Sequence, residues 1–426
     1  MARRRPATAR RSTVPGGSPG PRLDLAVRPP EPHEREAVLA CSEAAYGVRY
    51  GEAARDRLLE RFDGGDVRCA VTGDGELVGL AAIDDVELTV PGPALLRVAG
   101  WSEVAVAPTA RRRGVLRALV GALRAEAVAD GRAGAVLFAS EAGIYGRFGF
   151  APACSAARYQ LDLARVRLRP GPAPAGRVHL LRPNEAASAL PAVFDAARRL
   201  RPGEVDRAAG AFATLLEPTG PAGAARFVAA YERSGRLDGY AVYDVGPRPG
   251  GRPGRQVELV ELVAVAASAE AALWDHLLAT DLVRLLVTGE RPVDEALRHR
   301  LEDPRALETV AVEDHLWLCL LDPAVALAAR RYGAPGRLIL EVRTESDPPS
   351  RLLLASDGAG SATVAPTTAP ADLVLDGAAL AAAYLGGTSL GSLCRAGRVQ
   401  EQRPGARSLA TALLATEDAP FCTGDV

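Results

Sequence analysis

The segment from Trp101 to Ala139 constrains the fold of this chain more than any other stretch. An apolar strand, Trp101 to Ala107, stops at Pro108, because proline cannot donate to a strand ladder. Five apolar residues then recur at the spacing of one helical face: Val115, Leu116, Leu119, Val120 and Leu123. The apolar run 135–139 is typical of a buried strand. Strand, helix and strand in this order predict a βαβ unit within an α/β domain.

The turn between that strand and that helix reads Arg111-Arg-Arg-Gly114. Amides at a helix N-terminus have no intrahelical partner and carry the positive end of the macrodipole, so such a turn can hold a diphosphate. Gly114 lets the backbone approach the phosphate oxygens, and Arg111 and Arg112 add positive charge. A run of three arginines is by itself more often a solvated face. The flanking strand and helix favour phosphate binding here.

A second motif, Ser140-Glu-Ala-Gly-Ile-Tyr145-Gly-Arg-Phe-Gly-Phe150, directly follows the buried strand. Open α/β sheets bind their ligands at the carboxyl ends of strands, so this motif lies where a site is expected. A short helix there carries Tyr145. A lone tyrosine is more commonly a packing residue with a satisfied hydroxyl, and spacing alone does not decide between the two roles.

The length of 426 residues predicts two or three domains. We expect a disordered leader over 1–22, an α/β domain over 23–157, a second mixed domain over 158–321 and an α+β domain with an irregular tail over 322–426. The second domain repeats the strand-then-helix order, with a helix over 269–278. Its turn, Ala266 to Ser268, has neither arginine nor glycine. A second copy of the fold would therefore have a degenerate nucleotide pocket.

Charge and cysteine content exclude several classes. The net charge of −1 argues against a nucleic-acid partner, and no apolar run is long enough to span a membrane. The six cysteines are scattered without metal-ligand spacing, which indicates a cytoplasmic protein with no metal site and no disulfide framework. All 51 basic residues counted as Lys+Arg are arginine, so self-acetylation could occur only at the amino terminus.

Together these motifs resemble the acetyl-coenzyme A signature of the GNAT N-acetyltransferase superfamily, and more narrowly the Eis (enhanced intracellular survival) family. The narrower resemblance rests on four segments spread over all three domains: the Ser140 to Gly149 motif, Gly239-Tyr-Ala-Val-Tyr243, His315-Leu-Trp-Leu-Cys-Leu-Leu-Asp322 and Leu385-Gly-Gly387. It implies tandem GNAT domains, the second degenerate, followed by a domain resembling sterol-carrier proteins. It also implies a homo-oligomer, typically a hexamer.

The resemblance further implies roles for individual residues. The backbone at Val104 and Val106 would pair with the pantetheine arm of acetyl-coenzyme A, and Arg111, Arg112 and Gly114 would hold its diphosphate. Ser140 would lie near the thioester, and Tyr145 matches the general acid. The terminal carboxylate, on Val426, matches the proposed general base, and Asp425 beside it is the acidic residue we expect to attract substrate.

Two positions depart from the expected pattern. Leu116 stands where the superfamily usually has a small residue, and the chain ends in Val426 where Eis proteins often have an aromatic residue, so the base is assigned by position alone. The predicted function is acetyl transfer from acetyl-coenzyme A, without a metal, to the amines of a small polycationic molecule such as an aminoglycoside or a polyamine. Two alternatives stay open: acetylation of protein lysines, and a non-catalytic protein that binds acyl-coenzyme A or lipid.

Overall fold

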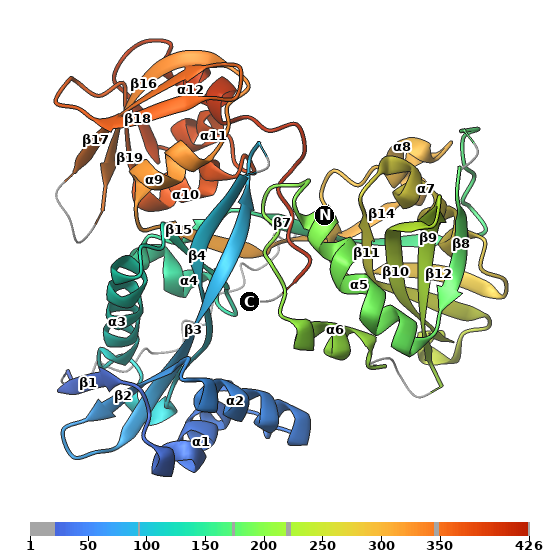
Figure 1. The fold of residues 1–426 in the computed structure, drawn as a ribbon, viewed down its shortest axis with the longest axis horizontal. Helices are drawn as coiled ribbons and strands as arrows, with labels where there is room; N and C mark the ends of the chain where they lie inside the picture. The colour runs from blue at the N-terminus through green and yellow to red at the C-terminus, as the bar shows by residue number, and fades with distance from the viewer. Residues whose placement is uncertain (1–21, 93, 173–174, 219–222, 345–348, 425–426) are drawn as a thin grey trace, which may run out of the picture. The chain divides into compact units, whose positions relative to one another are not determined.

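The structure is a computed structural model that describes residues 22–92, 94–172, 175–218, 223–344 and 349–424 (Figure 1). Its contacts divide the chain into two compact units. The first unit comprises the chain up to Ala82 together with Glu103–Ala122, and the second comprises Ile83–Ser102 and everything from Leu123 onward. Almost the whole leader predicted over 1–22 lies outside the described residues. No described helix is long and apolar enough to cross a membrane.

The first unit is a small antiparallel sheet covered by two helices. It holds strands β1 (Leu25–Arg28) and β2 (Val67–Thr72) and part of each of β3 (Leu77–Val90) and β4 (Ala94–Val106), in the order β1-β2-β3-β4. Helices α1 (Arg35–Tyr46) and α2 (Glu52–Gly64) pack apolar side chains such as Leu39 and Leu58 against the sheet. Strands β2 and β3 are antiparallel and are joined by the turn at Gly73-Asp-Gly75.

In the second unit, β4 pairs in parallel with β5 (Gly134–Phe138), and α3 (Val115–Ala129) lies between them in the chain, which confirms the βαβ prediction. Strand β4 begins at Ala94, earlier than predicted. On its other side β5 pairs antiparallel with β15 (Leu316–Leu320), which also pairs with β6 (Ala151–Pro152). A strand from about 180 residues later in the chain therefore completes the sheet that contains β5.

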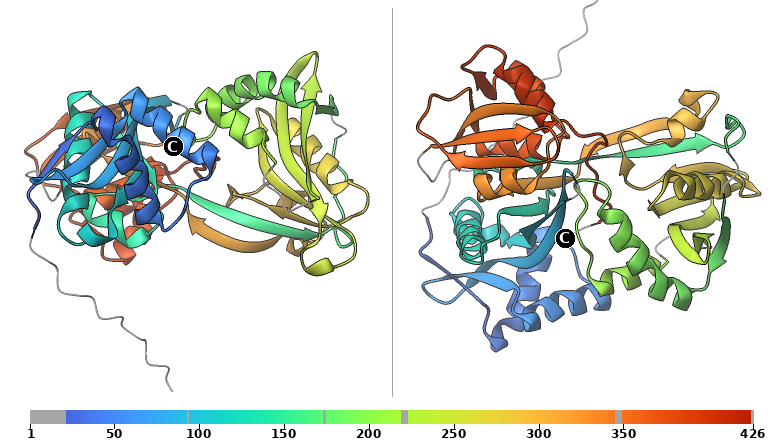
Figure 2. Two further views of the ribbon diagram at one scale, coloured as in Figure 1. Left: turned by 90° about the horizontal axis from the view of Figure 1, so that it is seen from below. Right: turned by 45° about the horizontal axis from the view of Figure 1, so that its top comes forward.

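A larger sheet follows in the order β13-β7-β12-β11-β10-β9-β8, with β14 also paired to β7. Its strands are β7 (Ser155–Asp162), β8 (Arg177–Leu181), β9 (Ala225–Arg233), β10 (Arg236–Pro247), β11 (Arg255–Ala264), β12 (Val283–Thr288), β13 (Arg291–Pro292) and β14 (Glu308–Asp314). Helices α5 (Pro183–Arg198) and α6 (Ala209–Leu216) cover the face that carries Tyr240 and Val242. Helix α7 (Ala267–Leu278) covers the opposite face, with Ala241 and Tyr243 (Figure 2).

Two segments of the chain repeat one order of elements. The first repeat runs β1, α1, α2, β2, β3, β4, α3, β5, and the second runs β8, α5, α6, β9, β10, β11, α7, β12. In both repeats the strand before the last helix is parallel to the strand after it. In both repeats a Pro-x-Glu sequence opens the first helical segment: the 3-10 turn Pro32–Glu34 before α1, and the first turn of α5. Its glutamate accepts a hydrogen bond from the N-cap amide, Glu34 from Glu31 and Glu185 from Arg182.

The third region is a five-stranded sheet, β18-β17-β16-β19-β20, packed with helices. Its strands are Ala362–Pro366, Ser350–Asp357, Pro335–Arg343, Leu373–Asp376 and Val399–Glu401, and its helices are α9 (Pro323–Ala329), α10 (Gly377–Tyr384), α11 (Leu390–Arg395) and α12 (Ala406–Leu414). Helix α10 is apolar on all sides and buried between this sheet and β15. Helix α9 ends at Ala329, because Arg330 adopts an extended conformation.

Candidate active site

The arginine turn lies in the first unit, between β4 and α3. A short 3-10 turn, Pro108–Ala110, leads into it, and the first intrahelical hydrogen bond runs from Ala118 to Gly114. Gly114 has a φ of 99°, which only glycine adopts without strain, so the structure gives a backbone reason for this glycine. Arg111 and Arg112 are exposed, and Arg111 donates to the carbonyl of Ala45 over 2.8 Å. The amides at the start of α3 face no helical acceptor, as anion binding requires.

Strand β4 carries a distortion just before the predicted pantetheine contacts. Its parallel register with β5 covers only Val98–Gly100, although β4 continues to Val106. Glu103 adopts a φ of 51°, an uncommon conformation for a strand residue. Val104 and Val106 are half-buried, and the carbonyl of Val104 accepts from the Tyr46 hydroxyl at 3.3 Å. Backbone groups of β4 beyond Gly100 are thus not used by the β5 ladder and suit an extended ligand chain.

Tyr145 lies in the second unit on α4 (Ala142–Tyr145), the short helix predicted after β5. Its side chain is 6% exposed, and its ring contacts Phe150 edge to face at 5.9 Å. The hydroxyl has no hydrogen-bond partner among the described residues. Burial, with a smaller contribution from the charge of Glu141, raises the pKa of Tyr145 to about 12. The phenol therefore holds its proton throughout the physiological range and can donate it.

Residues that the sequence did not indicate hold the Tyr145 loop in place. The Trp101 ring packs on Phe150 with 5.1 Å between centroids. Arg124, on the second half of α3, donates to the carbonyl of Phe148 at 2.7 Å. Ser140 follows β5 as predicted and is exposed immediately before α4. The described part of the chain contains no group of three or more His, Cys, Asp or Glu residues that could hold a metal ion.

The tail after α12 passes close to the carboxyl end of β5. The Phe421 ring stacks on His315 with centroids 6.5 Å apart, and His315 packs edge to face on Phe138, the last residue of β5, at 4.8 Å. The tail thus reaches the end of β5 within one unit, in line with the fold-back that a tail base requires. Asp425 and Val426, the predicted substrate contact and base, lie outside the described residues. The last described position is Gly424.

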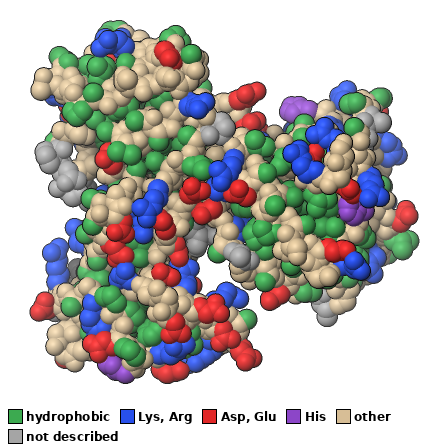
Figure 3. All heavy atoms as spheres, viewed as in Figure 1, with side chains coloured by type: hydrophobic (Ala, Val, Ile, Leu, Met, Phe, Trp, Pro, Cys, Tyr) green, Lys and Arg blue, Asp and Glu red, His purple; other side chains and the backbone are tan. Residues whose placement is uncertain are grey.

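Most of the other acidic residues near the sequence motifs already have basic partners. Glu43 is bonded to Arg49, Asp85 to Arg97, and Glu87 to Arg198. On the face drawn in Figure 3 acidic and basic side chains are intermingled. These carboxylates therefore fit ordinary structural ion pairs.

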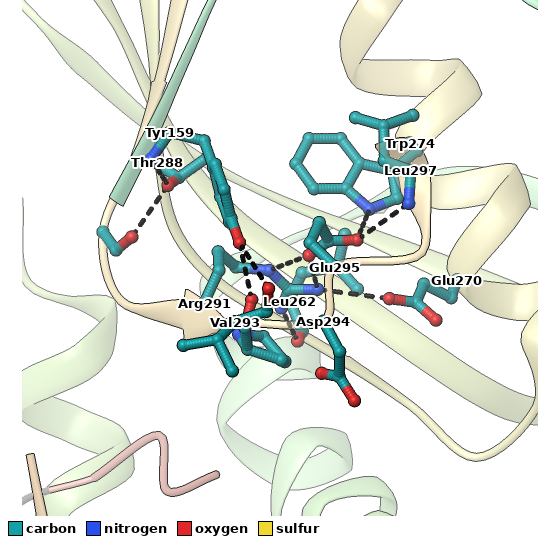
Figure 4. Close-up of polar contacts among 12 residues, drawn as sticks. Tyr159, Leu262, Glu270, Trp274, Thr288, Arg291, Val293, Asp294, Glu295 and Leu297 are labelled. Carbon is teal, nitrogen blue, oxygen red and sulfur yellow. Dashed lines mark hydrogen bonds and ion pairs between the residues drawn. The ribbon is translucent and has the colours of Figure 1, made fainter. Parts of the chain in front are cut away.

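The second repeat fills the corresponding turn with its own charges (Figure 4). There α7 begins at Ala267, directly after β11 and two connecting residues. Arg291, 3% exposed, donates to Glu295 at 2.8 Å, to the carbonyl of Leu262 at 2.7 Å and to Glu270, in the first turn of α7, at 3.2 Å. Burial raises the pKa of Glu270, and the charge of Arg291 opposes that shift. The helix N-terminus that would attract a phosphate instead has a carboxylate of the protein itself beside it.

Beside this turn lies a cavity of about 290 Å³. Its walls include the turn residues Val265–Ala267 and Glu270, the loop residues Arg201 and Glu204, and Phe421 and Thr423 of the tail. The site predicted to be degenerate has therefore no basic turn and no glycine, and the tail forms one of its walls.

Comparisons with known proteins agree with this architecture. Models of the acetyltransferase (GNAT) domain match residues 26–153 and 203–328, and a sterol carrier protein domain matches residues 323–423. The GNAT fold implies acetyl-coenzyme A as co-substrate.

Relatives resemble nearly the whole chain. An N-acetyltransferase from Streptomyces avermitilis is 34% identical over 93% of this chain and 92% of its own length. The N-acetyltransferase Eis of Mycobacterium tuberculosis is 35% identical over 81% of this chain and 85% of its own. The crystal structure of Eis1 from Mycobacterium abscessus superimposes with a TM-score of 0.83 at 32% identity, covering 95% of this chain and 100% of that one. The chain therefore belongs to the Eis family of GNAT N-acetyltransferases and is an enzyme that transfers acetyl groups to amines.

Proposed function

We propose that this enzyme acetylates the amines of a small polycationic molecule, of the aminoglycoside or polyamine kind, by direct attack of the amine on acetyl-coenzyme A. One observation carries the mechanism: Tyr145 is a buried phenol at the carboxyl end of β5. Its pKa is raised to about 12, and its hydroxyl forms no hydrogen bond with any described residue. A proton donor is what the departing thiolate requires.

The residues of the first repeat fit the co-substrate. Acetyl-coenzyme A supplies an acetyl group activated as a thioester. Arg111, Arg112 and the amides after Gly114 hold the diphosphate, the β4 backbone at Val104 and Val106 pairs with the pantetheine arm, and Ser140 lies toward the thioester. The exposed arginines, the start of α3 and the unpaired edge of β4 support this assignment.

Proton transfers complete the reaction. Alkylamines are mostly protonated at neutral pH, so the Val426 carboxylate accepts a proton from the substrate ammonium and leaves a neutral nucleophile. The amine nitrogen then bonds to the acetyl carbon as the carbon–sulfur bond breaks, and the new amide nitrogen releases its surplus proton to solvent. Tyr145 donates its proton to the sulfur and regains one from solvent. No cysteine nucleophile is required.

The acidic end of the tail supports a cationic substrate. Asp425 stands beside Val426, so the side-chain carboxylate of Asp425 accompanies the terminal carboxylate that we propose as the base. Two neighbouring carboxylates attract a cation. Acetylation of protein lysines is the second candidate.

An amine panel tests the proposal. The enzyme is incubated with acetyl-coenzyme A and, in turn, an aminoglycoside, a polyamine and a lysine peptide, and thiol release is followed. We expect rapid release with the small polycations and little with the peptide. A preference for the peptide would favour the lysine alternative. Thiol release that does not depend on any amine would contradict direct attack.

We also propose that the enzyme is a cytoplasmic homo-oligomer, a hexamer as family members typically are. Strand β14, at the edge of its sheet, exposes Val310 and Val312, which are 58% and 59% accessible in one chain. All six cysteines are free, as a reducing compartment requires. Sedimentation equilibrium of the full chain should give six times the monomer mass of 44.4 kDa. A monomer would contradict the proposal.

A further inference from the structure

We propose that Glu204 of the second repeat is a positioning residue that fixes the tail so that its terminal carboxylate can act as the base. This inference rests on the proposed function of that carboxylate. Glu204 lies in the connection between α5 and α6, and no sequence motif marks it.

The Glu204 carboxylate is occupied by the tail. It is 6% exposed, and its oxygens accept from the Thr423 amide at 2.9 and 3.1 Å and from the Thr423 hydroxyl at 2.8 Å. The thiol of Cys422 is 3.3 Å away. Burial raises the pKa of the Glu204 carboxyl, and the hydrogen bond from the Thr423 hydroxyl and the charge of Arg207 oppose that shift. Thr423 stands three residues before the terminal carboxylate.

A second contact locks the Thr423 side chain. Its hydroxyl accepts from Arg207 at 2.9 Å while donating to Glu204, and Arg207 is itself held by Glu261 at 2.6 Å. Arg207 also stacks over the Phe194 ring at 4.1 Å. One hydroxyl thus bridges the buried Glu204 carboxyl group and the Arg207 guanidinium, which leaves the tail little freedom to rotate at this point.

Glu204 is in turn fixed to the first repeat. Its carbonyl accepts from the Thr89 amide of β3 at 2.8 Å, and the Gly203 amide donates to Thr89 at the same distance. Leu88 and Val205 form an antiparallel bridge. The segment 203–205 is therefore a short added strand on the part of β3 in the second unit, so Glu204 connects the tail directly to the sheet of the first repeat.

The same segment is shaped for close approach of the tail. The Phe421 amide donates to the carbonyl of Pro202 at 2.9 Å. A Cβ added to Gly203 would lie 2.5 Å from the sulfur of Cys154 and 3.0 Å from the Phe421 nitrogen, so only glycine fits there. Upstream, Arg201 donates to the carbonyl of Ala419 at 3.0 Å and Asp294 accepts from its amide at 2.8 Å. Three tail residues in succession, Ala419, Phe421 and Thr423, are thus anchored on the way to the end of the chain.

The test compares Glu204→Gln and Thr423→Val with the conservative Thr423→Ser and the control Glu232→Gln. Glu232 is a glutamate of the same repeat that pairs with Arg177 at the surface, away from the tail. We expect Glu204→Gln and Thr423→Val to lower kcat about tenfold or more at neutral pH, with the KM for acetyl-coenzyme A unchanged. Thr423→Ser and Glu232→Gln should keep the wild-type rate. Thr423→Val guards against misfolding, because it removes the hydroxyl and leaves the buried glutamate intact.

Two further measurements separate positioning from simple stabilisation. The defect should shrink as pH rises toward the pKa of the substrate amine, since less base is then needed. In a chain extended by two glycines, which moves the terminal carboxylate away, adding Glu204→Gln should lower the rate no further.

If the extension alone leaves the rate unchanged, the carboxylate is not the base and the proposed mechanism fails. If the extension lowers the rate but Glu204→Gln and Thr423→Val do not, the positioning role of Glu204 is overturned while the mechanism stands. A defect that is equal at every pH would also overturn it.

Discussion

The two GNAT repeats share their order of elements, yet they treat the turn after their fourth strand in opposite ways. The first repeat leaves a basic, glycine-containing turn with exposed Arg111 and Arg112. The second buries Arg291 and satisfies it with Glu295, Glu270 and a carbonyl. A helix N-terminus attracts negative charge in either case: in the proposed function a ligand supplies that charge in the first repeat, and Glu270 of the protein supplies it in the second. The comparison shows that the same fold can leave the turn open to an anion or can fill it with ion pairs of its own side chains.

The second repeat, whose turn has neither arginine nor glycine, contacts the tail. The cavity beside its turn includes Phe421 and Thr423 in its walls, and Glu204 binds the tail from the adjoining connection. In the proposed mechanism the catalytic groups and the residues that support them are thus divided between the repeats.

The largest difference in kcat should separate substitutions at two buried tyrosines, Tyr145 in the first repeat and Tyr243 in the second. The pKa of each is raised to about 12. Tyr145→Phe should lower kcat by two to four orders of magnitude, roughly, because the general acid is lost. Its KM for acetyl-coenzyme A should change little. Tyr243→Phe, which removes a hydrogen bond to His276, should keep the wild-type rate. Equal rates for both variants would show that Tyr145 is not the general acid and that the two tyrosines do not differ in function.

The buried charges of the second repeat should matter for stability instead. Arg291→Met should lower the free energy of unfolding by about 3–5 kcal/mol, because it leaves the buried Glu295 without its cation. Urea denaturation followed by the fluorescence of Trp274, which bonds Glu295, measures the loss. If Arg291→Met is as stable as the wild type, the ion pairs of Arg291 with Glu295 and Glu270 do not stabilise the second repeat.

The turn of the first repeat should affect cofactor binding alone. Replacing both Arg111 and Arg112 by alanine should raise the KM for acetyl-coenzyme A about 10- to 100-fold, since each exposed guanidinium contributes a modest charge-assisted bond. Arg252→Ala, at an exposed arginine of the loop between β10 and β11, is the matched control. An unchanged KM would place the diphosphate elsewhere.

The smallest effect concerns the glutamates that begin the two repeats. The hydrogen bond from Arg28 is the largest cause that lowers the pKa of Glu34 to about 2, and Arg182 does the same for Glu185. A depressed pKa means that the stabilisation is present above the unfolded value near 4.5 and is lost as pH falls toward 2. Glu34→Gln, at a largely buried carboxylate, should cost about 1–2 kcal/mol at pH 7 and nothing near pH 2.

Glu185→Gln, at a more exposed carboxylate, should shift the thermal midpoint less than Glu34→Gln does. Thermal unfolding at several pH values checks both variants. A pH-independent loss in Glu34→Gln would show that its charge is not what stabilises the cap.

Local patterns in the sequence predicted the first repeat well. Helix α3 begins at Val115, directly after the basic turn, and Tyr145 lies on a short helix after β5. Periodicity and turn chemistry are short-range signals, so they work where neighbours in the chain are neighbours in space. Long-range partners left no such signal. The apolar run Leu316–Leu320 could have paired with any strand, and α10 could not be assigned because an apolar run shows no period. Nothing in the sequence around Glu204 distinguishes it from a surface glutamate, because its partner Thr423 comes 219 residues later in the chain.

Strand β15 has a consequence for how the chain is made. Residues 134–138 and their partners 316–320 are separated by the whole second repeat, so the edge of β5 that binds β15 stays unpaired while the ribosome adds those residues. An unprotected apolar edge invites pairing with other nascent chains. The amino-terminal catalytic part should consequently be insoluble when expressed alone, and its maturation should depend on chaperones until Leu320 emerges.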